Sequence, residues 1–289
     1  MNLSVVVFTG LLVGFFIPTF GTLITPFLQP LLMALTFFGT LDLKISDIIT
    51  DIKKPQRMLP VLALIHLGGP FIIFLLRDFF SPEIFLGLII STSVSSGISI
   101  IFLSKLFGGN VSQALVLTSI SNITAPLTIP FIVLLFTQTR INTDPLQMSL
   151  TIVKLIVVPF LFAQIISQTK WKEKISKFSS ELSILVLFFL IVGVIASVRD
   201  LLLINIFLSL QLAVVLSAIA VGLFTCGYLL GTDPKLRVTF ALAAIYRNFA
   251  LSTVLSLSLF NSMIAIPSVV FTIVVHILII PISFYLSKK

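Results

Sequence analysis

The chain is a succession of apolar segments, each about as long as the hydrocarbon core of a membrane is thick, separated by short polar turns. A helix needs about 20 apolar residues to cross that core, where the backbone has no water to bond and a helix satisfies its N–H and C=O groups internally. Of the 289 residues, 58% are hydrophobic and 10% are charged. We therefore expect an all-α polytopic membrane protein with ten transmembrane helices and no soluble domain. The segments span residues 2–18, 21–41, 58–76, 83–106, 111–137, 146–168, 181–198, 203–230, 236–260 and 262–286.

Lysine and arginine residues crowd the turns on one side of this predicted membrane domain. If both termini face the cytoplasm, the inner turns hold Lys44, Lys53, Lys54, Arg57, Lys105, Lys170, Lys172, Lys174, Lys177, Lys235, Arg237, Lys288 and Lys289, and the outer turns hold Arg77, Arg140 and Arg199. Cytoplasmic loops carry an excess of basic residues. The bias predicts a multi-pass protein of a prokaryotic plasma membrane with both termini cytoplasmic. It also accounts for the net charge of +8 without a nucleic-acid partner.

One arginine, Arg247, lies in the middle of the ninth apolar segment. Arginine keeps its proton, and a charge at the bilayer centre costs ~2.5 to 3.5 kcal/mol even on the mildest insertion scale. Such a residue faces a cavity or a partner and marks a functional site, or it reaches toward the interface or caps backbone carbonyls. The residue type leaves both readings open. We take Arg247 and its neighbour Asn248 as candidate substrate-binding residues.

The fourth segment carries a dense run of hydroxyl side chains at residues 91–99. Serines can bond to their own helix, so packing between helices is one explanation. The explanation we favour is a break in the helix, where hydroxyls and freed backbone groups line a cavity. Ser95, Ser96 and Ser99 are then candidate substrate-binding residues.

The two halves of the chain repeat a pattern. A turn at residues 107–110 precedes a segment with a proline at Pro130, and a turn at 260–262 precedes a segment with a proline at Pro281. This spacing places the hydroxyl-rich run of the fourth segment opposite Arg247 of the ninth. Each half has an odd number of segments, so the second copy enters the membrane inverted. We predict two inverted five-helix repeats, residues 1–137 and 138–289, with broken helices four and nine crossing.

Two stretches resemble the bile acid:sodium symporter family. Residues 104–111 (SKLFGGNV) and 118–130 (TSISNITAPLTIP) look like the hairpin between helices four and five of that family, and residues 247–251 (RNFAL) sit where the family has its second crossover. The resemblance implies a panel of helices 1, 2, 6 and 7 and a core of helices 3–5 and 8–10. It also implies secondary transport by alternating access around a substrate site at the crossover. Asn122, in the matching hairpin, either lines the substrate path or bonds backbone freed by Pro126.

The sequence departs from that family at the ion ligands. Sodium-coupled members carry a Glu followed four positions later by Gln-Asn in helix nine; here the Glu position is Ala243 and the Gln position is Arg247, while Asn248 matches. Thr118 still matches a hydroxyl ligand of the family's first sodium site, so Thr118, Ser99 and Asn248 remain a thinned candidate set for Na⁺. We hypothesise that Arg247 replaces the ion as a fixed positive charge, and that the substrate is a small organic anion whose carboxylate or sulfonate Arg247 can hold bidentately.

Other function classes have weaker support. His66, His276 and the lone Cys226 are isolated, and no paired acids or His-Glu motif is present, so we expect neither an enzyme nor a metal site. Lys154, within the sixth segment, either draws anions toward the cavity or reaches to a membrane face. A sodium-coupled organic anion symporter is the nearest alternative, and a channel or structural bundle is a more distant one. The expected partners are a small organic anion and the lipid bilayer.

Overall fold

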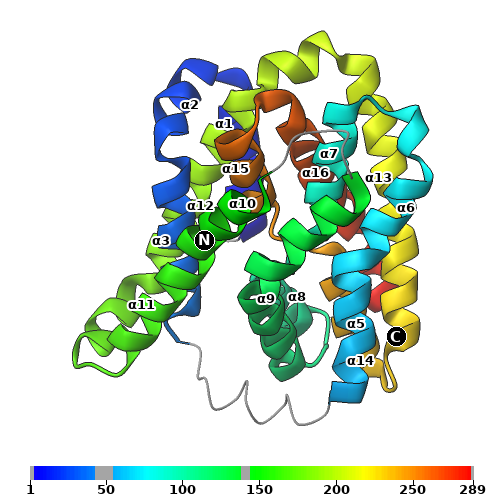
Figure 1. Cartoon of the computed structure of the whole chain (residues 1–289). Coiled ribbons are helices and arrows are strands. Elements are labelled where there is room, and N and C mark those ends of the chain that lie inside the picture. Colours follow the sequence, from blue (N-terminus) through cyan, green and yellow to red (C-terminus); the bar gives the residue numbers. More distant parts are fainter. Residues whose placement is uncertain (1–2, 43–54, 138–143, 288–289) are drawn as a thin grey trace.

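The computed structural model describes residues 3–42, 55–137 and 144–287, which are almost entirely helical (Figure 1). The helices are α1 (Leu3–Phe16), α2 (Pro18–Ile24), α3 (Leu28–Thr40), α5 (Pro55–Ala63), α6 (Gly69–Leu75), α7 (Pro82–Ser93), α8 (Ser99–Leu106), α9 (Val111–Thr137), α10 (Pro145–Ile152), α11 (Val158–Ser167), α12 (Trp171–Ile204), α13 (Ile206–Leu230), α14 (Pro234–Ile245), α15 (Phe249–Leu259) and α16 (Ser262–Ser287). Short 3₁₀ turns lie at Thr25–Phe27 and Arg77–Phe79, and π-helical segments lie at Leu64–Gly68 (η2) and Val153–Val157 (η4).

Within the described residues, seven helical runs are long and apolar enough to cross a membrane. Three shorter apolar helices, at Val5–Phe16, Pro82–Ser93 and Phe249–Leu259, add to them. The expected all-α polytopic membrane protein is confirmed at this level. Six of the basic residues on which the predicted orientation depends lie outside the described residues: Lys44, Lys53, Lys54, Arg140, Lys288 and Lys289.

Several helices begin in the same way, with a polar cap followed by proline. Asp144 accepts hydrogen bonds from the backbone N–H groups of Leu146 (2.9 Å) and Gln147 (3.1 Å) at the start of α10. Asp233 accepts one from Leu236 (3.0 Å) at the start of α14. A cap satisfies N–H groups that have no partner in the first turn, and a proline at the first position has no N–H to satisfy. These Asp-Pro pairs therefore fix where the helices start.

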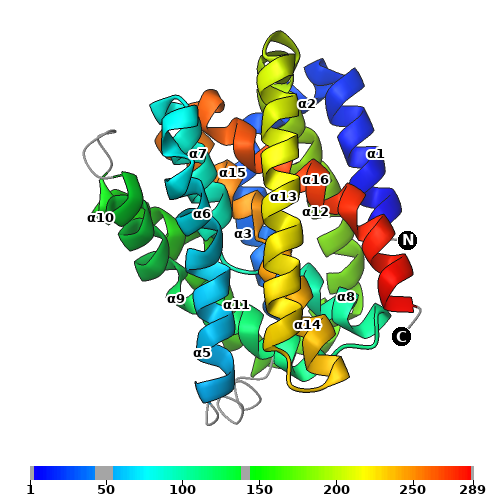
Figure 2. The same cartoon turned by 90° about the vertical axis from the view of Figure 1, so that its right-hand side faces the viewer.

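Packing divides the helices into two groups. In the first group α12 lies against α1, α2 and α3, and both α11 and η4 lie against α3. In the second group α7, α13 and α15 all contact α16, α14 contacts α13, and α9 contacts α7 and α8. Figure 1 shows the first group mostly on the left, in blue, green and yellow-green, and the second mostly on the right; in Figure 2 the second group faces the viewer. The groups meet where α10 packs on α9 and where α12 packs on α16.

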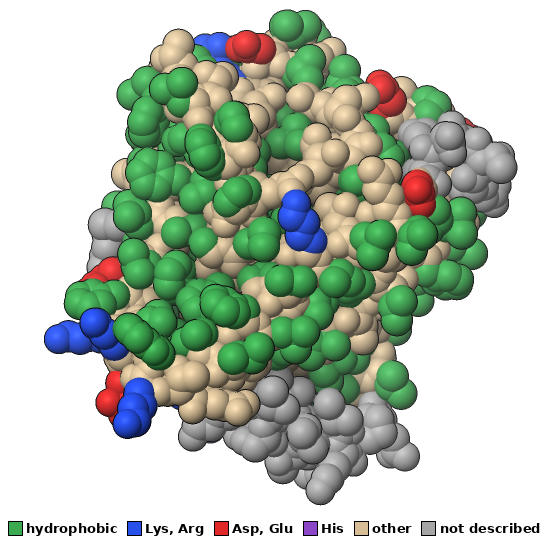
Figure 3. All heavy atoms as spheres, turned by 60° about the vertical axis from the view of Figure 1, so that its left-hand side comes forward, with side chains coloured by type: hydrophobic (Ala, Val, Ile, Leu, Met, Phe, Trp, Pro, Cys, Tyr) green, Lys and Arg blue, Asp and Glu red, His purple; other side chains and the backbone are tan. Residues whose placement is uncertain are grey.

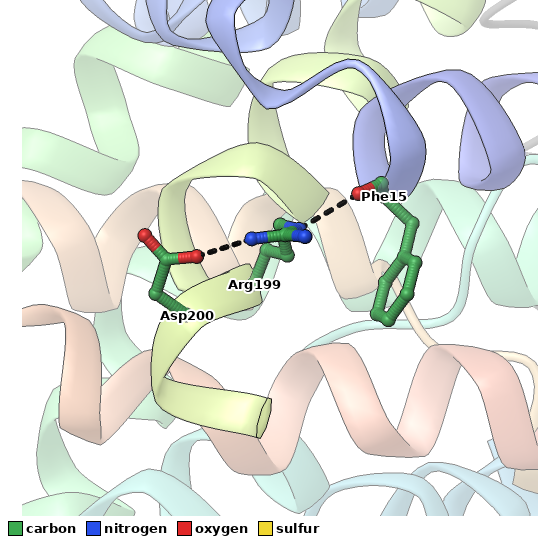
Figure 4. A network of polar contacts seen from close by, with 3 residues as sticks. All are labelled: Phe15, Arg199 and Asp200. Atoms are coloured by element: carbon green, nitrogen blue, oxygen red, sulfur yellow. Dashed lines mark hydrogen bonds and ion pairs between the residues drawn. The ribbon is translucent and has the colours of Figure 1, made fainter. Parts of the chain in front are cut away.

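A partly buried polar contact holds α1 against α12. The Nε atom of Arg199 donates to the carbonyl oxygen of Phe15 over 2.8 Å, and its NH1 group pairs with Asp200 at 2.6 Å (Figure 4). The last carbonyls of a helix lack intrahelical donors and carry partial negative charge, so a guanidinium is a suitable partner. This contact fixes one end of the first group.

Candidate functional site

Two helices are interrupted, and their interruptions lie side by side. α7 ends at Ser93 and α8 begins at Ser99, while α14 ends at Ile245 and α15 begins at Phe249. Between them, Ser96 and Arg247 form an isolated antiparallel β-bridge. The break that the hydroxyl-rich run predicted in the fourth segment is therefore present, and it faces the predicted partner in the ninth.

Backbone hydrogen bonds satisfy the groups that the breaks release. The N–H of Gly97 donates to the carbonyl of Tyr246 (2.9 Å), and the N–H of Asn248 donates to the carbonyl of Ser95 (2.7 Å). Unpaired backbone groups at this depth would each cost several kcal/mol, on the order of the desolvation of an amide. A Cβ atom on Gly97 would lie 2.9 Å from the carbonyl oxygen of Arg247, so the close approach of the two interrupted segments requires glycine here.

The serines of the break stabilise the crossing itself. The hydroxyl of Ser96 donates to the carbonyl of Ala243 (2.8 Å), and the hydroxyl of Ser95 donates to Oδ1 of Asn122 (2.7 Å). Both serines are fully buried. Asn122 in turn donates to the carbonyl of Thr118 (2.8 Å) and to that of Ser96 (3.5 Å). Ser95 and Ser96 are therefore occupied by structural hydrogen bonds, and Asn122 connects the crossing to α9.

The guanidinium of Arg247 points into the second helix group. Arg247 is only 2% exposed, and its NH1 group donates to the carbonyl oxygen of Ile65 in η2. In a π-helix that carbonyl would pair with the nitrogen of residue 70, which is Pro70 and has no N–H. Arg247 thus supplies a donor that the main chain cannot, as the carbonyl-capping expectation described. Its Nε and NH2 groups, however, have no hydrogen-bond partner within the described residues.

His66, the neighbour of Ile65, is a second basic side chain at this place. Its Nδ1 lies 2.9 Å from the carbonyl oxygen of Ser93 at the end of α7. A carbonyl only accepts hydrogen bonds, so Nδ1 carries the hydrogen. Its Nε2 is buried without a partner in the described part of the chain. Ile65 and His66 in η2 therefore connect this helix to both interrupted segments.

No carboxylate balances Arg247 among the described residues. The ion pairs there are Arg77–Asp78 and Arg199–Asp200, which have side chains substantially exposed. Ala243, at the position where the resemblance expects Glu, is fully buried. The crossing thus holds a buried, uncompensated positive charge.

A small cavity of about 30 Å³ lies between the two helix groups, beside the crossing. Its polar lining on the crossing side comes from Asn248 and from one face of α9, and on the opposite side from Thr36 and Thr40 of α3. The complete lining is Thr36, Thr40, Ile98, Ile101, Thr118, Ser119, Asn122, Ile123, Ile156, Val157, Phe160 and Asn248. A volume of this size holds about one or two water molecules, so the cavity is closed to an organic anion in this conformation.

The structure separates the predicted substrate residues into two sets. Asn122 and Asn248 line the cavity, whereas Arg247, Ser95, Ser96 and Ser99 do not. In this conformation the guanidinium therefore does not reach the cavity that the asparagines line. Ser119, Thr36 and Thr40 line it too and were not predicted. The spacing of four residues between Thr36 and Thr40, which puts both on one helix face, was the available signal for α3.

The candidate sodium residues also separate. Thr118 and Asn248 share the cavity, whereas Ser99 lies outside it. The hydroxyl of Thr118 is buried and unpartnered within the described residues, and Oδ1 of Asn248 accepts from the backbone of Leu251 at 3.1 Å. The cavity lining thus offers hydroxyl and amide oxygens and, among the described residues, no carboxylate. The positive charge of Arg247, next to Asn248 in the chain, disfavours a cation here.

Comparison with known proteins identifies the family that shares this sequence. The model of the sodium bile acid symporter family matches residues 29–205, more than half of the chain. The uncharacterized sodium-dependent transporter YocS of Bacillus subtilis (strain 168) is 23% identical over 296 residues, covering 99% of this chain and 90% of the relative. The uncharacterized protein YbaS of the same organism is 22% identical over 248 residues, covering 82% and 80%. The chain belongs to the sodium bile acid symporter family and is a multi-pass membrane transporter, not an enzyme.

Proposed function

We propose that the protein is a secondary transporter of small organic anions that works by alternating access, with Arg247 as a fixed cation where sodium-coupled relatives hold an ion. The observation that carries this proposal is the burial of Arg247. It is 2% exposed, donates to the carbonyl of Ile65 and has no acidic partner among the described residues. A charge in such a place is costly and is retained where it has a function.

The sign of that charge favours an anionic substrate. The ends of α7 and α14 and the starts of α8 and α15 all meet at the crossing. Helix ends of both signs are thus present, and their partial charges largely offset one another. Arg247 then sets the local potential. In a low-dielectric interior this potential extends to the neighbouring cavity, where Asn122 and Asn248 supply polar groups for the substrate.

The transport mechanism rests on a proposed symmetry. In the first repeat, residues 1–137, the interrupted pair α7 and α8 precedes α9, which contains Pro126 and Pro130. In the second, residues 138–289, the interrupted pair α14 and α15 precedes α16, which contains Pro267 and Pro281. This parallel supports ten spans arranged as inverted repeats, with the first helix group as panel and the second as core. Rocking of one against the other would expose the cavity to each side in turn.

Uptake into proteoliposomes tests the proposal. We would measure uptake of a panel of labelled small carboxylates and sulfonates with sodium or with choline as the external cation, for wild type, Arg247→Gln and Arg247→Lys. We expect saturable uptake that is stimulated by internal unlabelled substrate and equal in the two salts. Arg247→Gln is expected to lose it and Arg247→Lys to retain part. Absence of countertransport stimulation would favour a channel, and a strict sodium requirement would reject the fixed-cation mechanism.

The nearest alternative is a sodium-coupled symporter of organic anions. The observation in its favour is that the hydroxyls of Thr118 and Ser119, which line the cavity, are buried and have no hydrogen-bond partner among the described residues; they are oxygen atoms of the kind sodium takes. The relative YocS is also described as sodium-dependent. The choline arm of the same experiment separates the two mechanisms.

A further inference from the structure

A second cation lies within a membrane-spanning run, on the other helix group. Lys154 belongs to the π-helical segment η4 inside the apolar run Pro145–Ser167, yet its side chain is exposed. Figure 3 shows one face of the molecule, where hydrophobic side chains cover much of the surface and one basic side chain stands apart from the charged side chains near the upper and lower ends. π-Helical segments often occur at functional sites. An exposed ammonium in such a run therefore needs an explanation beyond packing.

The lysine takes part in a hydrogen-bond chain that connects the two helix groups. Its Nζ donates to Oε1 of Gln29 on α3 (3.3 Å), and Nε2 of Gln29 donates to the hydroxyl of Ser258 on α15 (2.9 Å). A second link lies nearby along the same run: the hydroxyl of Ser149 donates to the carbonyl of Pro126 (2.7 Å). That carbonyl would pair within α9 with residue 130, a proline without N–H.

These contacts lie on one side of the cavity. Each of the three helical segments carries one residue of this hydrogen-bond network and one residue of the cavity lining. Gln29 lies seven residues before Thr36, Lys154 lies three before Val157, and Ser258 lies ten after Asn248. At ~1.5 Å per residue, the hydrogen bonds among Lys154, Gln29 and Ser258 lie roughly 5 to 15 Å from the cavity along the helix axes. If both termini are cytoplasmic, this is the outer side of the membrane. The hydrogen bonds among Lys154, Gln29 and Ser258 then close the cavity toward the exterior.

The ammonium group of Lys154 has N–H donors that the described residues do not occupy. A lysine carries three N–H groups, and the described residues take one of them through Gln29. No acidic side chain of the described residues forms an ion pair with Lys154. When the outer side opens and Gln29 separates from Ser258, a positive charge with unused donors would face the path to the cavity.

We propose that Lys154 is the first binding group for the substrate's carboxylate or sulfonate, on the outer path to the cavity. This rests on the proposed transport of organic anions and adds a specificity-determining residue to it. Gln29 positions the ammonium, and Ser258 connects that position to the closed outer contact. Arg247 would then act on the anion only after Lys154 has received it.

A charged thiol reagent tests this without knowledge of the substrate. Cys226 is the one cysteine of the sequence, so Cys226→Ser followed by Ser258→Cys gives a single reporter beside Lys154. We would compare, in proteoliposomes, the modification rates by sulfonatoethyl and trimethylammonioethyl methanethiosulfonate. A unit charge ~6 Å away in water changes each rate about threefold in opposite directions, so their ratio should exceed that of Lys154→Gln by about tenfold. Lys154→Arg, which keeps the charge, should retain the ratio.

The outcomes separate this inference from the proposed function. A ratio that is the same in the reporter protein with Lys154 and in its Lys154→Gln variant overturns the inference. A reporter cysteine that neither reagent modifies also overturns it, because Lys154 would then not face water. If the ratio falls in Lys154→Gln as expected but no carboxylate or sulfonate is taken up, Lys154 is shown to be an accessible positive charge on the outer path, and its assignment as a substrate-binding group fails together with the transport proposal. If anions are taken up and the ratio does not change, transport stands and Lys154 has no part in it.

Discussion

The backbone N–H of Asn248 donates to the carbonyl of Ser95 over 2.7 Å, although the two residues lie in different halves of the chain. Together with the bond from Gly97 to Tyr246, it makes a short antiparallel pairing between two broken helices. These main-chain bonds set the register of the crossing.

Substitution of Gly97 tests the closeness of this pairing. Gly97→Ala places a Cβ about 2.9 Å from the carbonyl oxygen of Arg247, and overpacking of this kind costs about 1 to 3 kcal/mol. Gly222→Ala on α13 is the matched control, because a Cβ there meets no atom within 4 Å, and we expect it to be neutral or stabilising by up to about 1 kcal/mol. Thermal unfolding of the purified proteins in detergent measures both. Equal melting temperatures for Gly97→Ala and Gly222→Ala would show that the two interrupted segments do not approach so closely at Gly97.

The bond between Ser95 and Asn122 should appear as an energetic coupling. Ser95→Ala or Asn122→Ala each leaves a buried partner unsatisfied and should destabilise the protein by about 1 to 3 kcal/mol. The double variant should be less destabilised than the sum of the two, by on the order of 1 kcal/mol. Thermal unfolding of the four proteins gives this cycle. Strict additivity would contradict the contact.

Arg247 should be functionally necessary without being needed for stability. Arg247→Met removes a buried charge that has no acidic partner among the described residues, which favours the folded state, but it leaves the Ile65 carbonyl without its donor, at about 1 to 3 kcal/mol. These terms have opposite signs, so we expect the melting temperature to change little. Loss of a charge-assisted contact should reduce anion uptake by about 10- to 100-fold. A variant that unfolds readily would assign Arg247 a structural role.

The proposed orientation predicts which turns reach each side of the membrane. In the Cys226→Ser background, Phe79→Cys lies in the turn before α7 and Thr232→Cys in the turn between α13 and α14. With both termini cytoplasmic, an impermeant thiol reagent added to intact cells should label Phe79→Cys and not Thr232→Cys. Permeabilised cells serve as the control, where both should react. The reverse pattern would invert the topology.

Much of the architecture could be predicted from the sequence because the bilayer constrains it so strongly. Apolar length located the helices, and the hydroxyl-rich run located the break between α7 and α8. The position of Arg247 in the middle of an apolar segment made it a candidate functional residue, and the structure adds that its side chain is buried. These features depend on residues close in sequence, where spacing is informative.

The direction of side chains at the crossing could not be predicted in this way. Arg247 reaches Ile65, 182 residues earlier in the chain, through a π-helical segment that spacing alone does not reveal. Ser96 bonds to the carbonyl of Ala243, whereas Asn122 faces both the crossing and the cavity. Once a helix is broken, helical periodicity no longer determines which side chain points into a cavity and which into the core.

The most direct test of the fixed-cation mechanism is whether sodium stabilises the purified protein. We would compare thermal unfolding of wild type in sodium chloride and in choline chloride at equal ionic strength, since an ion that binds only the folded state stabilises it by RT ln(1 + [L]/Kd), about 1.8 kcal/mol at 20 times Kd. With Arg247 in place of the ion, we predict the same melting temperature in both salts. A sodium-dependent rise in melting temperature that saturates with concentration would show a bound ion and contradict the mechanism.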